Sequence, residues 1–219
     1  MRKIAGWILP SLLMVGMAYG QNYFWDFEDV PTGSIPEGWK VEATRQKGPL
    51  PTWKVIVDST APSGIKALAM AKPNHRSIGT FNLCWTDSVQ MENGTLEVKF
   101  KAVKGRIDRG GGIMWRVKDK NNYYVARYNP LEDNFRIYYV KNGKRVMIAS
   151  AKISLPSGKW HTMKIIQNGD RFEGYLNGRK LLSGRDRHIK GAGGVGLWTK
   201  ADAVTRFDDF SVKVKGNGE

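Results

Sequence analysis

The sequence predicts an all-β fold, an antiparallel sandwich in which two sheets pack face to face. Polar and apolar residues alternate over short runs along most of the chain, and Asn-Gly-type turn signals separate these runs. After the N-terminal segment, no run of about twelve residues repeats with the period near 3.6 that an amphipathic helix needs. About a dozen short strands joined in this way need two sheets, each burying one face against the other.

The first twenty residues have the pattern of a secretory signal peptide. Arg2 and Lys3 are followed by the mostly apolar stretch 4–17, and Ala18-Tyr19-Gly20 supplies small residues for cleavage. The apolar stretch is short for a membrane span, although an N-terminal anchor helix is the alternative. We therefore predict a signal peptide at 1–20, a single domain at 21–215, a loose tail at 216–219, and a secreted or periplasmic protein with no transmembrane span after cleavage.

The N-terminal part of the domain, residues 21–60, is rich in Pro, Gly and Trp. We expect it to form one strand and loops that wrap the sandwich. The segment GTLEVKFKAV at 94–103 follows with strict alternation, which places Leu96, Val98 and Phe100 on a dry face of a strand.

The central segment contains two predicted hairpins. Residues 111–129 form a strand, a Lys-Asn-Asn turn and a returning strand, and residues 134–151 form a hairpin with Asn142-Gly143 at its tip. Asn and Gly suit a tip of this kind because both tolerate positive φ.

The C-terminal segment continues the same pattern. A strand at 160–167, a turn at 168–170, a strand at 171–176 and the turn Asn177-Gly178 are followed by the strands 194–200 and 207–214. The number of residues between consecutive turns matches the length of one strand that crosses a sheet.

The composition limits the possible partners. The formal charge of +15 falls to +13 once Arg2 and Lys3 are removed, and a cationic exported domain attracts polyanions. An ordinary solvated surface is the alternative. Because no long Lys/Arg run is present, we expect no specific nucleic acid. Cys84 is the only cysteine, so the fold has no internal disulfide, and its apolar neighbours predict a buried, inert thiol.

The order of several motifs resembles that of a known superfamily. Three motifs follow one another along the chain in this order: FWDFEDVPTGSIPEGW, GKWHTMKIIQNGDRFEGYLNGRKL and GGVGLWTKADAVTRFDDFSV. Together they resemble the concanavalin A-like lectin/glucanase superfamily, and within it the laminin-G-like and 3-keto-disaccharide-hydrolase-type domains of exported bacterial proteins. The resemblance implies a jelly roll of two curved sheets, with ligands on the concave sheet or its rim loops.

The catalytic patterns of this superfamily are missing or altered. No Glu-x-Asp-x-x-Glu run, which in the glucanases sets the separation of two carboxylates, is present. In the keto-disaccharide-hydrolase domains one strand carries Glu, Gln and Asp on alternate positions. The corresponding residues here are Val125, Arg127 and Asn129, and a valine cannot accept a proton. The Gly-rich run 191–196 matches a dinucleotide fingerprint only by chance, because no βαβ unit surrounds it.

Strand alternation predicts a basic and aromatic surface. We expect Ile113, Trp115 and Val117 to share the core face, and Val195 and Leu197 to do the same. The outward set then consists of Arg116, Arg127, Arg136, Tyr138 and Trp198. Aromatic rings stack on sugar rings, and guanidinium groups bind hydroxyl and acidic groups. Ordinary outward residues on a wet sheet, with no shared cleft, are the alternative.

A second group of residues suggests a structural metal. The resemblance implies that the first and last strands meet, as in jelly-roll carbohydrate modules with a structural Ca²⁺. This meeting would bring together four acids with the oxygen ligands that Ca²⁺ prefers: Glu28, Asp29, Asp208 and Asp209. One turn-capping Asp among solvated acids is the alternative. We expect no required cofactor, and this calcium would be structural and not catalytic.

The sequence thus supports three hypotheses. The first is a non-catalytic carbohydrate-binding module whose basic, aromatic concave face takes glycans, including anionic polymers. The second is a diverged 3-keto-disaccharide hydrolase, which requires a carboxylate beside Arg116. The third is a laminin-G-like adhesion module that contacts protein through a broad apolar patch.

Overall fold

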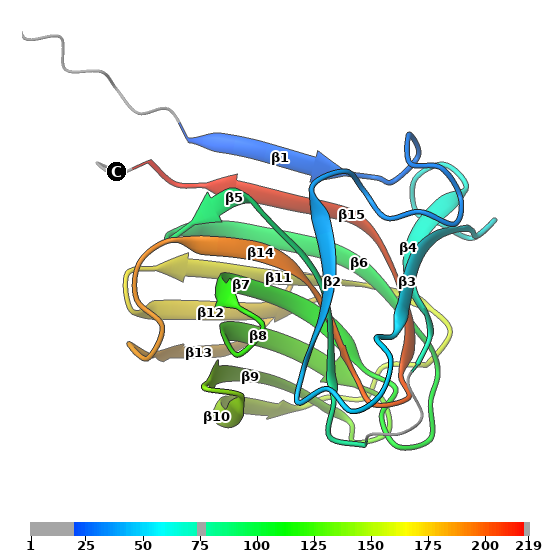
Figure 1. The fold of residues 1–219 in the computed structure, drawn as a ribbon. Coiled ribbons are helices and arrows are strands. Elements are labelled where there is room, and N and C mark those ends of the chain that lie inside the picture. The colour runs from blue at the N-terminus through cyan, green and yellow to red at the C-terminus, as the bar shows by residue number, and fades with distance from the viewer. Residues whose placement is uncertain (1–19, 74–77, 217–219) are drawn as a thin grey trace, which may run out of the picture.

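The computed structural model describes residues 20–73 and 78–216. All but the last residue of the predicted signal peptide at 1–20, and most of the predicted tail, lie outside the described residues. Within the described part, no helix has the length and hydropathy needed to cross a membrane. Fifteen strands account for the regular structure of these residues, and they form the two layers of an antiparallel sandwich (Figure 1).

The first layer, sheet A, has eight strands, in the order β13-β12-β11-β6-β15-β4-β3, with β1 added beside β15. Its strands are β1 (Gln21–Trp25), β3 (Thr52–Val57), β4 (Lys66–Lys72), β6 (Gly94–Lys104), β11 (Trp160–Asn168), β12 (Arg171–Leu176), β13 (Arg179–Arg185) and β15 (Val204–Val214). The long last strand holds two partners along one edge. Its first half pairs with β4, and its second half pairs with β1 from Gln21↔Val214 to Trp25↔Phe210.

The second layer, sheet B, has seven strands in the order β10-β9-β8-β7-β14-β5-β2. They are β2 (Trp39–Thr44), β5 (Phe81–Met91), β7 (Gly111–Asp119), β8 (Asn122–Asn129), β9 (Asn134–Lys141), β10 (Lys144–Lys152) and β14 (Gly193–Lys200). Every pairing in this sheet is antiparallel. The all-β sandwich is confirmed, whereas residues 21–60 hold three strands where the sequence predicted one.

The tight turns follow the residues that favour them. Asn142 and Gly143 have φ of 50° and 72°, and Asn177 and Gly178 have φ of 48° and 79°. Two consecutive residues at positive φ match the twist of a two-residue hairpin, and Asn and Gly adopt this conformation at the least cost. The predicted tips at these two sites are therefore confirmed.

An inner core lies between the two sheets and contains buried residues of both. Leu96, Val98 and Phe100 of β6 contribute from sheet A, and Ile113 and Trp115 of β7 contribute from sheet B. These residues are fully buried, as the alternation predicted. Cys84 is also fully buried, so the prediction of a buried thiol is confirmed. Burial raises the pKa of this thiol, which disfavours the reactive thiolate.

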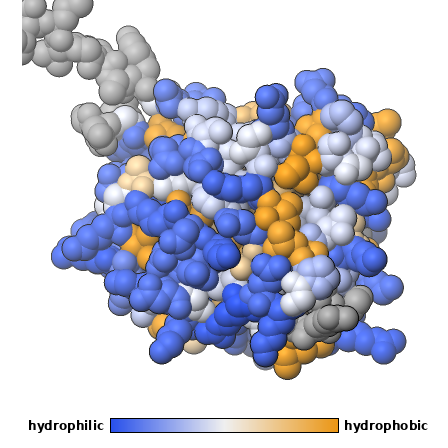
Figure 2. All heavy atoms as spheres, viewed as in Figure 1, coloured by the Kyte–Doolittle hydropathy of each residue, from blue (hydrophilic) through white to orange (hydrophobic). Residues whose placement is uncertain are grey.

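The outside of the sandwich is mostly polar. Figure 2 shows hydrophilic side chains over most of the face seen in Figure 1, with a strip of hydrophobic residues running through it. Exposed single apolar residues are ordinary on a folded protein. The unusual feature lies on the second face of sheet B, where a further apolar cluster is buried.

Candidate functional site

The face of sheet B turned away from sheet A holds a second cluster of buried residues. The residues of this outer cluster are Phe81, Leu83 and Trp85 of β5, Met114 and Val117 of β7, Tyr123 and Val125 of β8, Tyr138 and Val140 of β9, and Trp198 of β14. All of them belong to sheet B. An antiparallel sheet with one partner layer normally leaves its second face to solvent. The burial therefore requires a cover, which the structure builds from charged side chains.

Strand pairing places two arginines and one tryptophan in a single cross-strand row. Trp198 is paired with Gly112, Gly112 with Arg127, and Arg127 with Arg136. Residues paired directly across strands point to the same face of a sheet. Arg127, Arg136 and Trp198 therefore share the outer face.

Arg127 is the centre of a hydrogen-bonded network on this face. Its Nη1 donates to Asn134 Oδ1 at 2.8 Å, and its Nη2 donates to Glu132 Oε2 at 2.9 Å and to Tyr138 Oη at 3.2 Å. Arg136 Nη1 reaches the same Glu132 oxygen at 3.1 Å. With 1% of its surface exposed, Arg127 is a buried charge that needs these partners.

Two carboxyl groups beside Arg127 have pKa values shifted in opposite directions. Burial opposes ionisation of Glu132, yet hydrogen bonds from Asn134 and Arg127 lower its pKa to about 2. Burial raises the pKa of Asp108, and the positive charges of Arg127 and Lys200 offset only part of that rise. Lys200 Nζ lies 3.7 Å from Asp108 Oδ2. The face therefore carries one firmly ionised carboxylate and one that binds a proton more readily.

Arg145 covers the aromatic part of the outer cluster. It comes from the edge strand β10, and its Cζ lies 4.3 Å from the centre of the Tyr138 ring, 4.9 Å from Phe81 and 5.7 Å from Trp198. A guanidinium over aromatic faces is held by cation–π attraction. Burial lowers the pKa of Arg145, and the nearby charge of Arg127 lowers it further. The cover is thus a cation that forms no ion pair with any carboxylate in the described part of the chain.

Three buried polar atoms of these groups have no hydrogen-bond partner in the described part of the chain. They are Asp108 Oδ2, Arg127 Nε and Arg145 Nη1. An unsatisfied buried polar atom costs about 1–3 kcal/mol, so native proteins usually supply a partner. Two donors and one acceptor on a single face can be satisfied by a ligand that carries hydroxyl groups, since each hydroxyl both donates and accepts.

The structure brings together most of the side chains that the sequence selected. Arg127, Arg136 and Tyr138 are in direct contact through Glu132 and the tyrosine hydroxyl. Trp198 lies on the same face, but it is fully buried, and its Nε1 donates to Tyr123 Oη at 3.3 Å. Its ring therefore becomes available to a ligand only where Arg145 moves aside.

Arg116 lies elsewhere, which corrects the predicted alternation. It has φ of 48°, and the pairing of β7 with β8 is irregular between Trp115 and Asp119. This bulge puts Val117 in the outer cluster, although Ile113 and Trp115 belong to the inner core. The sequence had assigned all three residues to the core face.

The guanidinium of Arg116 is fully engaged at the end of the sandwich. Its three nitrogens donate to the backbone carbonyls of Glu92, Ile189 and Gly169 at 2.9, 3.1 and 2.6 Å. It joins three separate loops and has no place in the row of Arg127 and Trp198. This arrangement gives Arg116 a structural role.

Sequence reasoning missed Arg145, Asp108 and Glu132. Glu132 lies in the turn between β8 and β9, which folds it back onto Arg127. A signal was available for Arg145, because it follows the predicted Asn142-Gly143 tip at a position that pairs with Val140 of the outer cluster. No periodicity marks Asp108, since it lies in the loop before β7.

The four predicted calcium ligands are not gathered into one group. Glu28 Oε1 accepts the backbone N–H groups of Ile65 and Lys66 at 3.0 and 2.6 Å. Asp208 is buried and accepts the Ser63 N–H at 3.0 Å. Over residues 20–73 and 78–216, no cluster of three or more His, Cys, Asp or Glu is placed to hold a metal ion. Glu28 and Asp29 therefore do not join Asp208 and Asp209 as a ligand set, and calcium stays a prediction from the sequence.

One part of that region is nevertheless unusual electrostatically. Burial raises the pKa of Asp208 to about 6, and the neighbouring carboxylates of Asp209 and Asp26 add to the rise. Asp209 has φ of 49°, and its Oδ1 is buried without a hydrogen-bond partner in the described residues. Glu28 accepts backbone N–H groups and is not part of this acidic group. Asp26, which the sequence analysis did not select, is near enough to raise the pKa of Asp208.

Comparison with known proteins supports both the fold and the family. The levanase of Bacillus subtilis (strain 168) is 25% identical over 151 residues, which are 60% of this chain and 22% of that enzyme. The chain thus spans about a fifth of the curated relative that it matches. Carbohydrate binding module CBM66 from Bacillus subtilis has a TM-score of 0.61 and 25% identity, covering 83% of this chain and 99% of the module.

The fold is also that of a jelly-roll glucanase. The Bacillus licheniformis beta-glucanase has a TM-score of 0.59 at 12% identity, covering 90% of this chain and 99% of that enzyme. The predicted concanavalin A-like jelly roll is therefore confirmed. A sequence model of one family matches residues 27–213, nearly all of the described fold. The chain accordingly belongs to the 3-keto-alpha-glucoside-1,2-lyase-like domain family.

Proposed function

We propose that this domain binds carbohydrate on the outer face of sheet B. The observation that carries the proposal is the combination of aromatic rings with three unsatisfied polar atoms, on Asp108, Arg127 and Arg145, on one face. Aromatic faces bind the apolar side of a sugar ring, and fixed donors and acceptors bind its hydroxyls. The likeness to a carbohydrate binding module over 99% of that module supports the same function.

The groups on this face suit recognition. Arg127 is held in place by Asn134, Glu132 and Tyr138, so it would lose little side-chain entropy on binding. Its Nε is buried and has no hydrogen-bond partner in the described residues, so a ligand would reach it only after the side chains that cover it move. Arg145 has no such anchors, and we expect it to shift from the aromatic rings onto the ligand. Its guanidinium would then bridge hydroxyls or an acidic group of the glycan.

Glu132 is a poor candidate for a catalytic base. Its pKa of about 2 and its ion pairs with Arg127 and Arg136 stabilise the carboxylate and weaken its affinity for a proton. This supports the non-catalytic form of the proposal, in which the carboxylate orients two arginines.

The binding proposal can be tested by calorimetry with levan, inulin, β-glucan and polygalacturonate. We expect at least one of them to bind, and Arg145→Ala to weaken that binding by about tenfold because a desolvated charged hydrogen bond is lost. Arg179→Ala, an exposed arginine of sheet A, is the matched control. Absence of binding, or equal affinity of the two variants, would refute the proposal.

A glycoside-cleaving or lyase activity is the second candidate function. The raised pKa of Asp108 favours it, because a carboxyl group that holds its proton more readily can serve as a general acid. This hypothesis predicts turnover of a 3-keto glycoside that Asp108→Asn abolishes while binding persists. If the folded protein bound the 3-keto glycoside without converting it, the catalytic hypothesis would fail and only the binding function would stand.

Two further expectations stay predictions. The hypothesis of a laminin-G-like adhesion module that contacts protein would be favoured if the correctly folded domain bound no glycan at all. Export to the periplasm or beyond depends on residues 1–20, most of which lie outside the described residues.

A further inference from the structure

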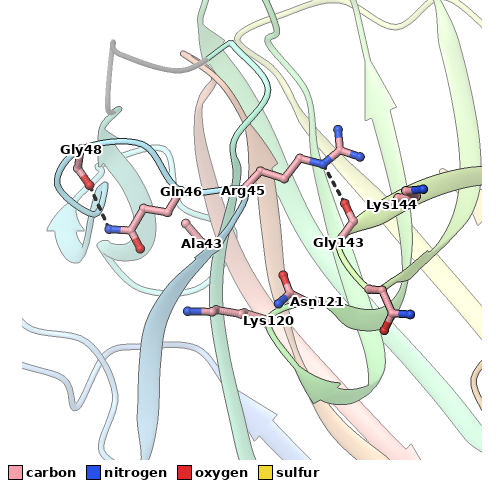
Figure 3. A pocket seen from close by; sticks show the side chains of 9 residues that line it. Ala43, Arg45, Gln46, Gly48, Lys120, Asn121, Gly143 and Lys144 are labelled. Carbon is pink, nitrogen blue, oxygen red and sulfur yellow. Dashed lines mark hydrogen bonds between the residues drawn. The ribbon is translucent and has the colours of Figure 1, made fainter.

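A polar pocket of about 730 Å³ lies at one end of sheet B (Figure 3). Three separate segments build it: the end of β2 with the loop after it, the turn between β7 and β8, and the turn between β9 and β10. Its polar lining residues are Arg45, Gln46, Lys120, Asn121, Asn142 and Lys144. We call it the end pocket.

The walls of the end pocket are tied to one another. Arg45 Nε donates to the Gly143 carbonyl at 2.7 Å, which Figure 3 shows as a dashed line. The Gly143 N–H donates to the Asn121 carbonyl at 3.0 Å, and the Asn142 N–H donates to Asn122 Oδ1 at 3.0 Å. These bonds connect the three segments, so the pocket is formed before any ligand arrives.

The end pocket is strongly cationic. Three of its lining residues are cations, and none is an acid. The nearby acid Asp119 is already occupied, since its Oδ1 accepts the Asn121 N–H at 2.6 Å and an Asn122 amide N–H at 3.0 Å. In residues 20–73 and 78–216, none of the three cations forms an ion pair. Like charges around one hollow repel, and an anion relieves that repulsion.

The backbone at the rim supports a functional reading. Arg45 has φ of 55°, a left-handed conformation that costs free energy for a residue with a side chain. That conformation, together with the bond to Gly143, holds the guanidinium at the wall of the pocket. Its two terminal nitrogens have no hydrogen-bond partner among residues 20–73 and 78–216, and they are suited to a carboxylate or a sulfate.

The end pocket lies next to the outer cluster. Arg45 Cζ lies 5.7 Å from the Phe81 ring of that cluster. Arg145, the residue after Lys144, stands 4.9 Å from the same ring. A glycan on the outer face would therefore extend one residue or substituent into the pocket.

We infer that the end pocket binds the anionic group of an acidic glycan, a carboxylate or a sulfate ester, while the adjoining sugar lies on the outer face. This inference rests on the proposed carbohydrate binding and names its substrate class. Amides of Gln46, Asn121 and Asn142 surround the charge and are suited to the neighbouring hydroxyls.

Calorimetry with oligogalacturonate and its neutral methyl ester separates charge from sugar. We expect the acid to bind at least tenfold more tightly than the ester. Raising the NaCl concentration from 0.05 to 0.5 M should weaken binding of the acid but not of the ester, because salt screens the attraction between the carboxylate and the cations of the pocket. A size-matched sulfated oligosaccharide distinguishes a sulfate preference from a carboxylate preference.

The matched variants remove two charges from different places. We expect the double substitution Lys120→Gln and Lys144→Gln to weaken binding of the acid about tenfold, because the loss of each exposed ion pair weakens binding about three- to fivefold. The affinity for the ester should not change. Lys159→Gln with Lys213→Gln, at two exposed lysines of sheet A and its loops, should have no effect.

Each outcome decides between the two claims. Equal affinity for acid and ester, or an equal effect of the two double variants, overturns the end-pocket inference and leaves carbohydrate binding standing. Failure of every glycan, neutral and acidic, overturns both.

Discussion

Trp198 and Arg127 lie in one cross-strand row of sheet B, with only Gly112 between them. A Cβ at position 112 would lie 1.8 Å from the Ala126 carbonyl oxygen, so no side chain fits there. The backbone of β8 occupies that space, so no side chain of β7 separates the aromatic ring from the buried guanidinium. The proposed binding face depends on this juxtaposition.

Replacing Trp198 should cost much stability. The ring is fully buried, lies 5.4 Å from Phe81 and donates to Tyr123. We expect Trp198→Ala to lower the free energy of unfolding by about 3–5 kcal/mol, because a large cavity forms and a hydroxyl loses its donor. Urea denaturation measures this change. Phe24→Ala, at a side chain with 60% exposure, should stay within about 0.5 kcal/mol of the parent. Equal losses in the two variants would contradict the burial of Trp198.

The ion pairs of Glu132 should make stability depend on acid pH. Its pKa of about 2 in the folded protein lies below its ordinary value of 4.5, so the unfolded chain binds more protons between these values. The stabilising contribution is present above pH 4.5 and is lost as the pH falls toward 2. Thermal unfolding of the parent and of Glu132→Gln should therefore differ most above pH 4.5 and converge near pH 2.

Exposed Glu37→Gln serves as the control for that experiment, because it removes the same charge without touching Arg127. A parent-minus-variant difference for Glu132→Gln that is constant from pH 2 to pH 7 would show that the carboxylate makes no favourable ionic contact.

The calcium prediction can be decided by thermal unfolding. If Ca²⁺ binds near β15, it neutralises the buried Asp208 and the unsatisfied Asp209 oxygen, and millimolar calcium raises the melting temperature of the parent. Asp208→Asn should lose that response, and Glu28→Gln should keep it, since Glu28 is occupied by amides. Identical melting in calcium and in EDTA would remove the metal from consideration.

The signal-peptide prediction is tested by expressing the whole chain in a bacterium with an outer membrane. We expect the exported form to begin at Gln21, because small residues precede that position. Mass spectrometry of the periplasmic fraction measures the N-terminus. A cytoplasmic protein that retains Met1 would contradict the prediction.

The fold could be predicted because its signals are local. Asn-Gly turns and strict alternation in strands such as β6 depend only on neighbouring residues and on the need to bury one face. The same rule placed Arg127, Arg136, Tyr138 and Trp198 on one face correctly.

The rest of the site depends on a bulge and on loops, which the alternation of polar and apolar residues does not predict. The bulge at Arg116 shifts the pattern by one residue, and no residue type announces it, since arginine rarely adopts positive φ. Glu132 and Asp108 reach the site from loops, whose direction is set by tertiary contacts. Arg145 was missed because the outward side of an edge strand normally faces water.

Because Gln21 pairs with Val214, any segment joined before β1 or after β15 leaves the sandwich from the same corner of sheet A (Figure 1). Attachment to a support or to another polypeptide through either terminus would therefore leave sheet B unobstructed. Under the proposed function, such tethering would leave the outer face of sheet B and the end pocket open to a polymeric glycan.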